Sequence, residues 1–313
     1  MSSARAHSWL RPRRLVPGDR IALVAPASSF ERDQFDAGVR ELLDRGFEPI
    51  YDERVFAVSR FVAGEARLRA SAIHDAWRDP SIAALIAVRG GYGSAQLLPL
   101  LDADLMRSAA KVFVGYSDVT SLLAFHMRHG VVSFHGPMIE RRIGAGSKGY
   151  DRDSFWRALT LAEALGVLAP EGLEALRVGE AGGVLAGGTL TQLAASLGTP
   201  WAFDPPEQCV LFIEDIGERP YRIHRLLTQL TQAGVLGRAV ALVFGEFPSC
   251  DEPGGAHAIR DVLREFVQDF DGPVLFGFPS GHTAGPTWTL PLGVRVRVTS
   301  TPPAIVIEEP AVT

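Results

Sequence analysis

The sequence is poor in cysteine, and this scarcity excludes two kinds of site. Only Cys209 and Cys250 occur among the 313 residues, which is too few for a disulfide framework and lacks the spacing of a metal site. We expect a reducing compartment, with both thiols buried as small apolar side chains. Because no cluster of His, Glu and Cys occurs at ligand spacing, we predict neither a metal ion nor another cofactor.

Long apolar runs and an excess of positive charge are also missing. No stretch approaches the ~18 apolar residues of a membrane span, and Pro17, Gly18, Asp19 and Arg20 interrupt the apolar core that a signal peptide needs. The net charge of -5 gives no broad attraction to phosphate backbones. We therefore expect a cytoplasmic protein that binds neither nucleic acid nor a membrane.

What is present is typical of a large α/β protein. The hydrophobic content of 47% and the charged content of 21% indicate a globular chain rather than a disordered one. Its length exceeds the usual ~100 to 200 residues of one domain, which favours two domains. Short apolar runs such as "RIALVAP" and "IAALIAVR" alternate with amphipathic helical segments in the first half. This alternation predicts a parallel sheet covered by helices on both faces.

A polar, glycine-rich stretch, "RRIGAGSKGYDRDS", suggests where the first domain ends. We predict an N-terminal α/β domain over residues 1–150, a linker over 151–185 and a C-terminal domain over 186–313. Near the end of the chain, Val294, Val296 and Val298 alternate with arginine. That pattern predicts a hairpin with one buried face.

One segment, "KVFVGYSDVTSLLAFHM", raises two interpretations of Ser117. A serine directly before a helical segment is a favoured helix N-cap. A hydroxyl on a strand-to-helix turn also projects above the sheet edge, where it can act as a nucleophile. Gly115 would relieve crowding at such a turn, but Val119 stands where the second glycine of G-x-S-x-G would be. The segment alone leaves both interpretations open.

A nucleophilic serine needs a base and an acid that orients the base. His282 lies in the glycine- and proline-rich "FGFPSGHTAGPTW" after an apolar strand, and His135 follows another apolar run. For His282 the alternative is a loop histidine bonded to the backbone. Glu214 and Asp215 end the strand "CVLFIED", and a helix cap describes Asp215 better than Glu214. The remaining histidines fit a base less well: His7, His74, His126, His129, His224 and His257.

The stretch "AVRGGYGSAQ" is a glycine loop between a predicted strand and a helix. Such a loop presents backbone N–H groups to an anion. The dinucleotide pattern fails, because Gln96 occupies its third glycine position, and no lysine supports a P-loop. The other use of the loop is an oxyanion hole, in which a second N–H comes from Asp118, the residue after Ser117.

Together, "RGGYGS", "VGYSDVTSLL", "FHGP", "FIEDIGERPYRIHRLLTQL" and "GHTAGPTWTLPLG" resemble the LD-carboxypeptidase family, the muramoyltetrapeptide carboxypeptidases, from about residue 18 to residue 308. The resemblance implies a serine peptidase with a triad of Ser117, Glu214 and His282. It also implies that the oxyanion donors are the backbone N–H groups of Gly91 and Asp118.

The same resemblance implies a flavodoxin-like parallel-sheet N-terminal domain, a smaller β-rich α/β C-terminal domain, and a homodimer. The implied substrate is cytosolic murein tetrapeptide, cut between diaminopimelate and the terminal D-alanine during peptidoglycan recycling. A carboxypeptidase must also bind a free carboxylate, for which an arginine fork is well suited. Arg89 and Arg219 are candidates by position.

Two residues depart from the family pattern. Thr189 stands where an asparagine is expected and His224 where an aspartate is commoner. We expect neither to touch the triad and both to border the substrate cleft or the domain contact. Two alternative functions stay open: an immunity-type serine peptidase that cleaves peptide-nucleotide antibiotics, and a non-catalytic anion-binding α/β protein. "EDIGERPYRI" looks closer to the recycling enzymes.

Overall fold

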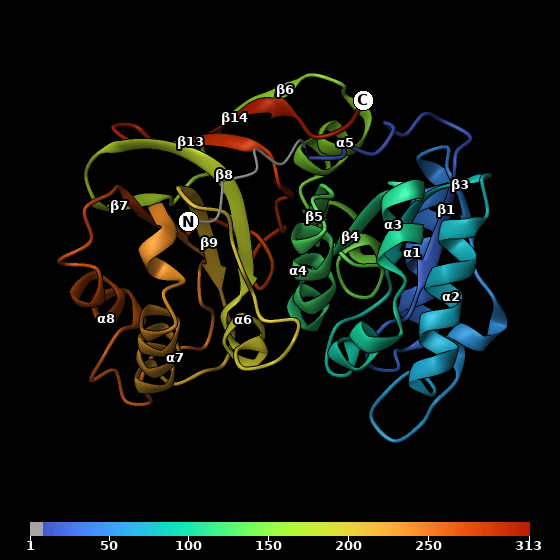
Figure 1. The fold of residues 1–313 in the computed structure, drawn as a ribbon, viewed down its shortest axis with the longest axis horizontal. Helices are drawn as coiled ribbons and strands as arrows, with labels where there is room; N and C mark the ends of the chain where they lie inside the picture. The colour runs from blue at the N-terminus through green and yellow to red at the C-terminus, as the bar shows by residue number, and fades with distance from the viewer. Residues whose placement is uncertain (1–8) are drawn as a thin grey trace.

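The computed structural model describes residues 9–313, so His7 lies outside the described residues. The strands form two β-sheets, and each sheet has its own covering helices (Figure 1). The first sheet has the strand order β12-β5-β4-β3-β1-β2. Its strands are β1 (Arg20–Val24), β2 (Glu48–Ile50), β3 (Ile82–Ala87), β4 (Val112–Gly115), β5 (Ser133–His135) and β12 (Leu290–Leu292).

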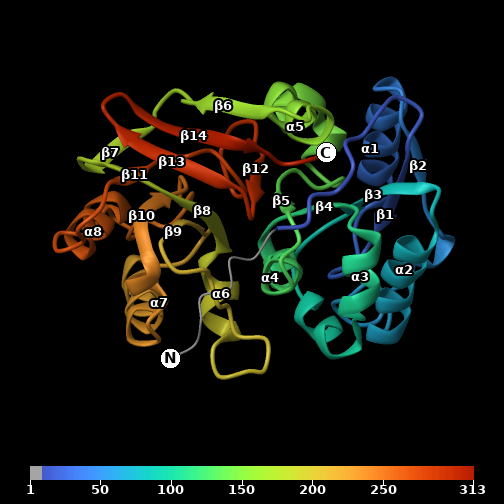
Figure 2. The same cartoon turned by 45° about the horizontal axis from the view of Figure 1, so that its top comes forward.

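Strands β1 to β5 of this sheet are parallel. From the β2 edge inward their order is 2-1-3-4-5, which is that of flavodoxin-like folds. Figure 2 shows β1 and β3 between α1 on one side and α2 and α3 on the other. Strands β3 and β4 are almost wholly buried, as their continuous apolar runs predict. The elements that cover this sheet are α1 (Arg32–Asp44), η1 (Glu53–Phe56), α2 (Ala66–Arg78), η2 (Ser94–Leu100), α3 (Ala103–Ala109), η3 (Ser117–Val119), α4 (Thr120–Arg128), η4 (Ile143–Lys148) and α5 (Arg152–Thr160).

The second sheet has eight strands in the order β6-β14-β13-β8-β9-β10-β11-β7. Strands β8 to β11 run parallel, and antiparallel strands flank them on both sides. The strands are β6 (Ala164–Leu168), β7 (Glu174–Arg177), β8 (Glu180–Thr189), β9 (Cys209–Glu214), β10 (Ala239–Phe244), β11 (Val274–Phe276), β13 (Arg295–Ser300) and β14 (Pro303–Pro310). The helical elements are α6 (Leu190–Ser196), α7 (Pro220–Gln232), η5 (Leu236–Arg238) and α8 (Ile259–Phe266).

These two sheets confirm the predicted α/β class with a flavodoxin-like parallel sheet and a second, β-rich part. The predicted hairpin is β13 with β14, and Val294, Val296 and Val298 are all fully buried. Within the range predicted as a linker, residues 151–185, the structure has α5, β6, β7 and the start of β8. The late strand β12 joins the first sheet by pairing with β5. The division into two domains and a linker stays a prediction.

Candidate active site

Ser117 lies two residues beyond the end of β4, on a turn with unusual backbone geometry. Its φ of 61° is in the left-handed region, which residues with a side chain rarely adopt and which is typical of strained turns at functional sites. Ser117 is the first residue of η3, but its side chain caps neither η3 nor α4. The helix-cap interpretation is therefore wrong, and the turn holds the serine as a nucleophile elbow would.

Two glycines allow the chain to pack tightly around Ser117. A Cβ built on Gly115 would lie 2.5 Å from Cγ1 of Val119, and one built on Gly90 would lie 2.9 Å from Cβ of Ser117. Neither position has room for a side chain. The elbow pattern has glycine at position 119, but here the Val119 side chain occupies that space and packs against Gly115. The turn therefore forms without the second glycine.

The glycine loop after β3 is tied directly to the Ser117 turn. The Ser94 N–H donates to Oδ2 of the buried Asp118 at 2.7 Å. On the other side of the loop, the Tyr92 N–H donates to Oγ of Ser28 at 3.1 Å. Within residues 9–313, the N–H groups of Gly91 and Asp118 donate no hydrogen bond. Two free backbone donors therefore lie on adjoining segments, as an oxyanion hole requires.

The buried Arg69 of α2 fixes the same loop, and sequence analysis missed it. Its guanidinium donates to the carbonyls of Gly64 at 3.0 Å, Gly93 at 2.9 Å and Pro26 at 2.5 Å. Burial lowers the pKa of Arg69. Arg69 is one of three arginines in the amphipathic helix α2, with Arg67 and Arg78, so nothing in the local pattern distinguished it from a surface charge.

Glu214 and His282 form the best-defined pair of the site. Oε2 of Glu214 accepts the backbone N–H of His282 at 2.9 Å and contacts its Nδ1 at 2.8 Å. Glu214 is fully buried at the end of β9, whereas the His282 side chain is 15% exposed. Since a carboxylate only accepts, Nδ1 carries the proton, and Nε2 of the neutral ring is the free basic nitrogen.

Each residue of this pair shifts the pKa of the other toward its charged form. Burial acts to raise the pKa of Glu214, but His282, His135 and Thr189 outweigh it, so the pKa lies below its ordinary value. Burial acts to lower the pKa of His282, yet Glu214 outweighs that effect and the pKa is raised. A base with a raised pKa takes up a proton more readily.

Thr189 contacts Glu214 directly, so the expectation that it touches no triad residue is wrong. Its hydroxyl donates a hydrogen bond to Oε1 of Glu214. The two residues are register partners on the parallel strands β8 and β9. The backbone N–H of Thr189 also donates to Oγ1 of Thr120 on α4, at 3.2 Å. His224, the other departure, is exposed on α7, with its ring 5.3 Å from that of Phe266.

A second histidine, His135, lies on the other side of Glu214. It is fully buried, its Nδ1 is 2.9 Å from Oγ of Ser280, and its Nε2 is 3.9 Å from Oε1 of Glu214. Burial lowers its pKa to about 4, so it is neutral near pH 7. Its Nε2 makes no hydrogen bond among the described residues, so His135 lies near Glu214 without binding it, whereas His282 has both the hydrogen bond to Glu214 and the raised pKa of a base.

Asp215 has the structural role that its sequence position indicated. Its Oδ2 accepts the N–H and the hydroxyl of Thr191 in the first turn of α6, at 2.9 and 2.7 Å. Burial raises the pKa of Asp215. Asp215 therefore fixes a helix end, and Glu214 alone pairs with His282.

Tyr116 connects the serine turn to the histidine loop. It directly precedes Ser117 and is buried, and its ring lies 5.1 Å from the His282 ring in an edge-on contact. The end of β4 in the first sheet therefore meets the loop that follows β11 in the second. The structure brings together segments that are 165 positions apart in the chain, from residue 117 to residue 282.

The two candidate arginines already have carboxylate partners. Nη1 of Arg89 donates to the Ser29 carbonyl at 2.8 Å, and its Nε is 3.3 Å from Oε2 of Glu140. Arg219 pairs with Glu252 through both its Nε and its Nη2. Binding of a substrate carboxylate by either arginine stays a prediction.

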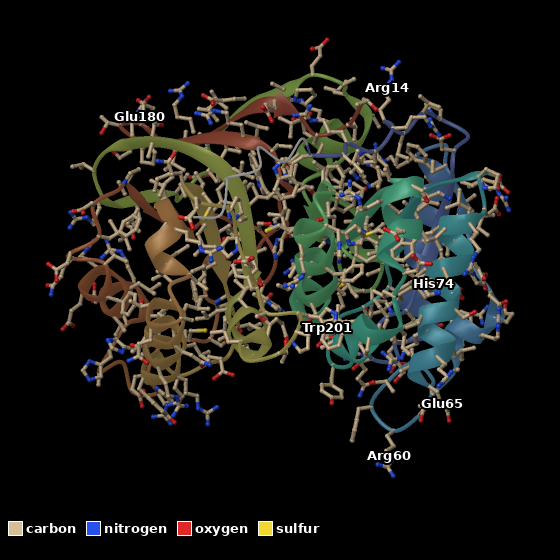
Figure 3. All side chains as sticks on the ribbon, viewed as in Figure 1. Arg14, Arg60, Glu65, His74, Glu180 and Trp201 are labelled. Carbon is tan, nitrogen blue, oxygen red and sulfur yellow. The ribbon has the colours of Figure 1, made fainter. Side chains whose placement is uncertain are left out.

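A cavity of about 380 Å³ lies between η2, α4, α6 and the loop that follows α6. Its lining includes Thr120, Ser121, Gln192 and Trp201 and contains no charged side chain. Figure 3 labels Trp201 between the two halves of the molecule. The cavity suits an uncharged group, because nothing in its wall would compensate a buried charge.

We also considered a metal site, a membrane-spanning helix and a reactive cysteine in the described part of the chain. Residues 9–313 contain no group of three or more His, Cys, Asp or Glu side chains placed to hold a metal ion. None of the helices described there is long and apolar enough to span a membrane. Both cysteines are buried, and burial raises the pKa of each to about 12.

Comparison with protein families gives two matches that cover most of the chain. Residues 21–136 match the LD-carboxypeptidase N-terminal domain, and residues 182–298 match the LD-carboxypeptidase C-terminal domain. A putative carboxypeptidase of Streptomyces coelicolor is 36% identical over 96% of this chain and 97% of its own. The murein tetrapeptide carboxypeptidase of Pseudomonas aeruginosa is 34% identical over 85% of this chain and 88% of its own.

Two solved structures share the fold. A muramoyltetrapeptide carboxypeptidase from Oxalobacter formigenes is 32% identical with a TM-score of 0.80, over 93% of this chain and 99% of that one. The wild-type microcin C7 self-immunity protein is 25% identical with a TM-score of 0.88, over 97% of this chain and all of that one. The immunity protein of Escherichia coli is 28% identical over 91% of both chains.

Proposed function

Since the chain belongs to the LD-carboxypeptidase family, whose N-terminal and C-terminal domain models it matches, we propose that it hydrolyses the amide bond between diaminopimelate and the terminal D-alanine of murein tetrapeptides. The observation that carries this proposal is the Glu214–His282 pair, 2.8 Å apart, in contact through His282 with Tyr116, the residue before Ser117 on its strained turn. Relatives named for murein or muramoyl tetrapeptide, at 34% and 32% identity, support the peptide class.

The proposed mechanism uses the triad of Ser117, His282 and Glu214. Nε2 of His282 takes the proton of the Ser117 hydroxyl as Oγ attacks the scissile carbonyl, and Glu214 holds the imidazole in the required tautomer. The N–H groups of Gly91 and Asp118 stabilise the oxyanion. His282 then passes its proton to the departing D-alanine amine, and the acyl group stays on Ser117.

Water completes the reaction in the second half of the cycle. His282 deprotonates a water molecule, the resulting hydroxide attacks the acyl-enzyme, and Ser117 recovers its proton as the tripeptide leaves. The carboxylate of D-alanine needs a cationic partner, for which we keep Arg89 and Arg219 as proposals. Following the family resemblance, we also propose that the protein is cytoplasmic and forms a homodimer. Light scattering on the purified protein tests whether it is a dimer.

A second candidate is hydrolysis of peptide-nucleotides. It is favoured by the TM-score of 0.88 to the microcin C7 self-immunity protein, against 0.80 to the muramoyltetrapeptide carboxypeptidase. Sequence identity points the other way, at 25% against 32%. We give identity more weight, because substrate choice depends on side chains and TM-scores compare backbones.

Side-by-side assays separate the candidates. The purified protein is given murein tetrapeptide, the same peptide ending in L-alanine, and aspartyl sulfamoyl adenosine, a ligand of one immunity-protein structure. Mass spectrometry follows the released amino acid. We expect D-alanine from the first compound and no alanine from the second. Faster cleavage of the sulfamoyl adenosine supports the immunity function, and cleavage of none supports a non-catalytic anion-binding protein.

A further inference from the structure

Arg142 makes an unusual set of contacts with the loop that carries His282. Its Nη2 donates to the carbonyls of Gly281 at 3.1 Å and Thr283 at 3.0 Å, and its Nη1 donates to the carbonyl of Gly285 at 3.0 Å. Gly281 and Thr283 are the residues directly before and after His282. One guanidinium therefore holds the backbone on both sides of the imidazole.

The same guanidinium reaches the serine turn. Its Nε donates to the Tyr116 hydroxyl at 3.3 Å, and Tyr116 precedes Ser117 and packs edge-on against the His282 ring. A further, longer bond from Nη1 to the Gly149 carbonyl, at 3.4 Å, anchors the side chain to its own segment. Arg142 thus links the element of the proposed nucleophile to the element of the proposed base.

These contacts are not those of a surface ion pair. Among residues 9–313, Arg142 forms no salt bridge, and its partners are neutral carbonyls and a hydroxyl. Burying part of a guanidinium against neutral acceptors costs solvation that only several well-placed bonds offset. The planar fork of arginine suits this arrangement, and the point charge of lysine does not. Its neighbour Arg141 differs, with a side chain that is 73% exposed.

We propose that Arg142 is a positioning residue, which fixes the His282 loop against the Ser117 turn so that base and nucleophile stay aligned. The role rests on the proposed serine-peptidase function. It acts on alignment rather than on substrate affinity, because the guanidinium is already occupied by the loop carbonyls. A misplacement of about 1 Å at a reacting group can cost about 10²-fold in rate.

The test compares Arg142→Met, Arg142→Lys and, as the matched control, Arg141→Met. We measure kcat and KM for D-alanine release, and the proton NMR resonance of the His282 Nδ1–H, assigned by its loss in His282→Gln. We expect Arg142→Met to lower kcat about 10²-fold with KM within about twofold, and to shift or broaden the resonance. Arg142→Lys should recover part of kcat, and Arg141→Met should match the wild type.

A folded Arg142→Met with wild-type kcat and an unchanged resonance would overturn the proposal, as would an equal loss in Arg141→Met. If Arg142→Met does not fold, Arg142→Lys decides: a lowered kcat with a cooperative thermal transition supports the role, and wild-type kcat refutes it. If the wild type releases no D-alanine, the proposed function fails by itself. The resonance alone then decides for Arg142, and an unchanged signal in its variants contradicts positioning.

Discussion

Glu214 holds both the backbone and the ring of His282 with a single carboxylate oxygen. Oε2 accepts the His282 N–H at 2.9 Å and contacts Nδ1 at 2.8 Å, while Oε1 accepts the Thr189 hydroxyl. The end of strand β9 therefore fixes the position of His282 within its loop and determines which ring nitrogen is free.

Replacing Glu214 by glutamine should remove most of the activity without preventing folding. The glutamine amide can donate to Nδ1, which selects the tautomer that leaves no basic nitrogen for Ser117. In comparable triads this change costs about 10⁴-fold in kcat. Steady-state kinetics of D-alanine release measure it, with the exposed Glu163→Gln as control. Wild-type kcat in Glu214→Gln would exclude Glu214 as the orienting acid.

The pH dependence of kcat/KM should reflect the raised pKa of His282. The base must be neutral to accept a proton, so activity falls as the pH drops through its pKa. Because Glu214 raises that pKa above the ordinary value of 6.5, we expect the acidic limb of the wild-type profile to lie above pH 6.5. In Glu214→Gln, the limb of the residual activity should move to lower pH. A wild-type limb below pH 6.5 contradicts this assignment.

Thr189→Val should destabilise the protein by about 1–3 kcal/mol, because it leaves a buried carboxylate without one of its donors. The change keeps the shape of the side chain and removes only the hydroxyl that bonds Oε1 of Glu214. Urea unfolding at pH 7 measures the loss. Thr189→Asn, which supplies an amide donor, should lose less. Equal stability of Thr189→Val and the wild type would show that the bond contributes nothing.

Gly90→Ala should impair catalysis by crowding the nucleophile. The new methyl group would lie 2.9 Å from Cβ and 3.1 Å from Oγ of Ser117, so the Ser117 turn must shift. We expect a clear fall in kcat and a loss of about 1–3 kcal/mol in stability. The matched control is Gly237→Ala, which has no atom within 4 Å of the added carbon. If both variants keep wild-type kinetics, the packing of the glycine loop on Ser117 is irrelevant to the reaction.

Local sequence patterns predicted the strands that consist of uninterrupted runs of buried apolar residues. The apolar runs of β1, β3, β4 and β9 are all strands, and Glu214 at the end of one strand meets His282 in the loop after another. Asp215 also bonds a helix start, as a capping acid should. The strand order followed from the family resemblance rather than from periodicity.

The sequence could not indicate contacts that depend on strand register or on distant backbone. Thr189 reaches Glu214 only because β8 and β9 pair with these two residues side by side, and β8 is so rich in small residues that it carries no strand pattern. The short β12, which contains Pro291, is a strand only through its pairing with β5. Arg69 bonds the distant carbonyls of Pro26 and Gly93, and Arg142 bonds those of Gly281 and Thr283, which no local spacing encodes.

The most direct test of the account is the release of D-alanine from murein tetrapeptide by the wild type and by Ser117→Ala, followed by mass spectrometry. The L-alanine-terminated peptide and the thermal unfolding curve of the variant serve as controls. We predict release by the wild type from the D-alanine peptide only, and a loss on the order of 10⁴-fold or more in a folded Ser117→Ala. Full activity of Ser117→Ala would contradict the central claim that this serine is the nucleophile.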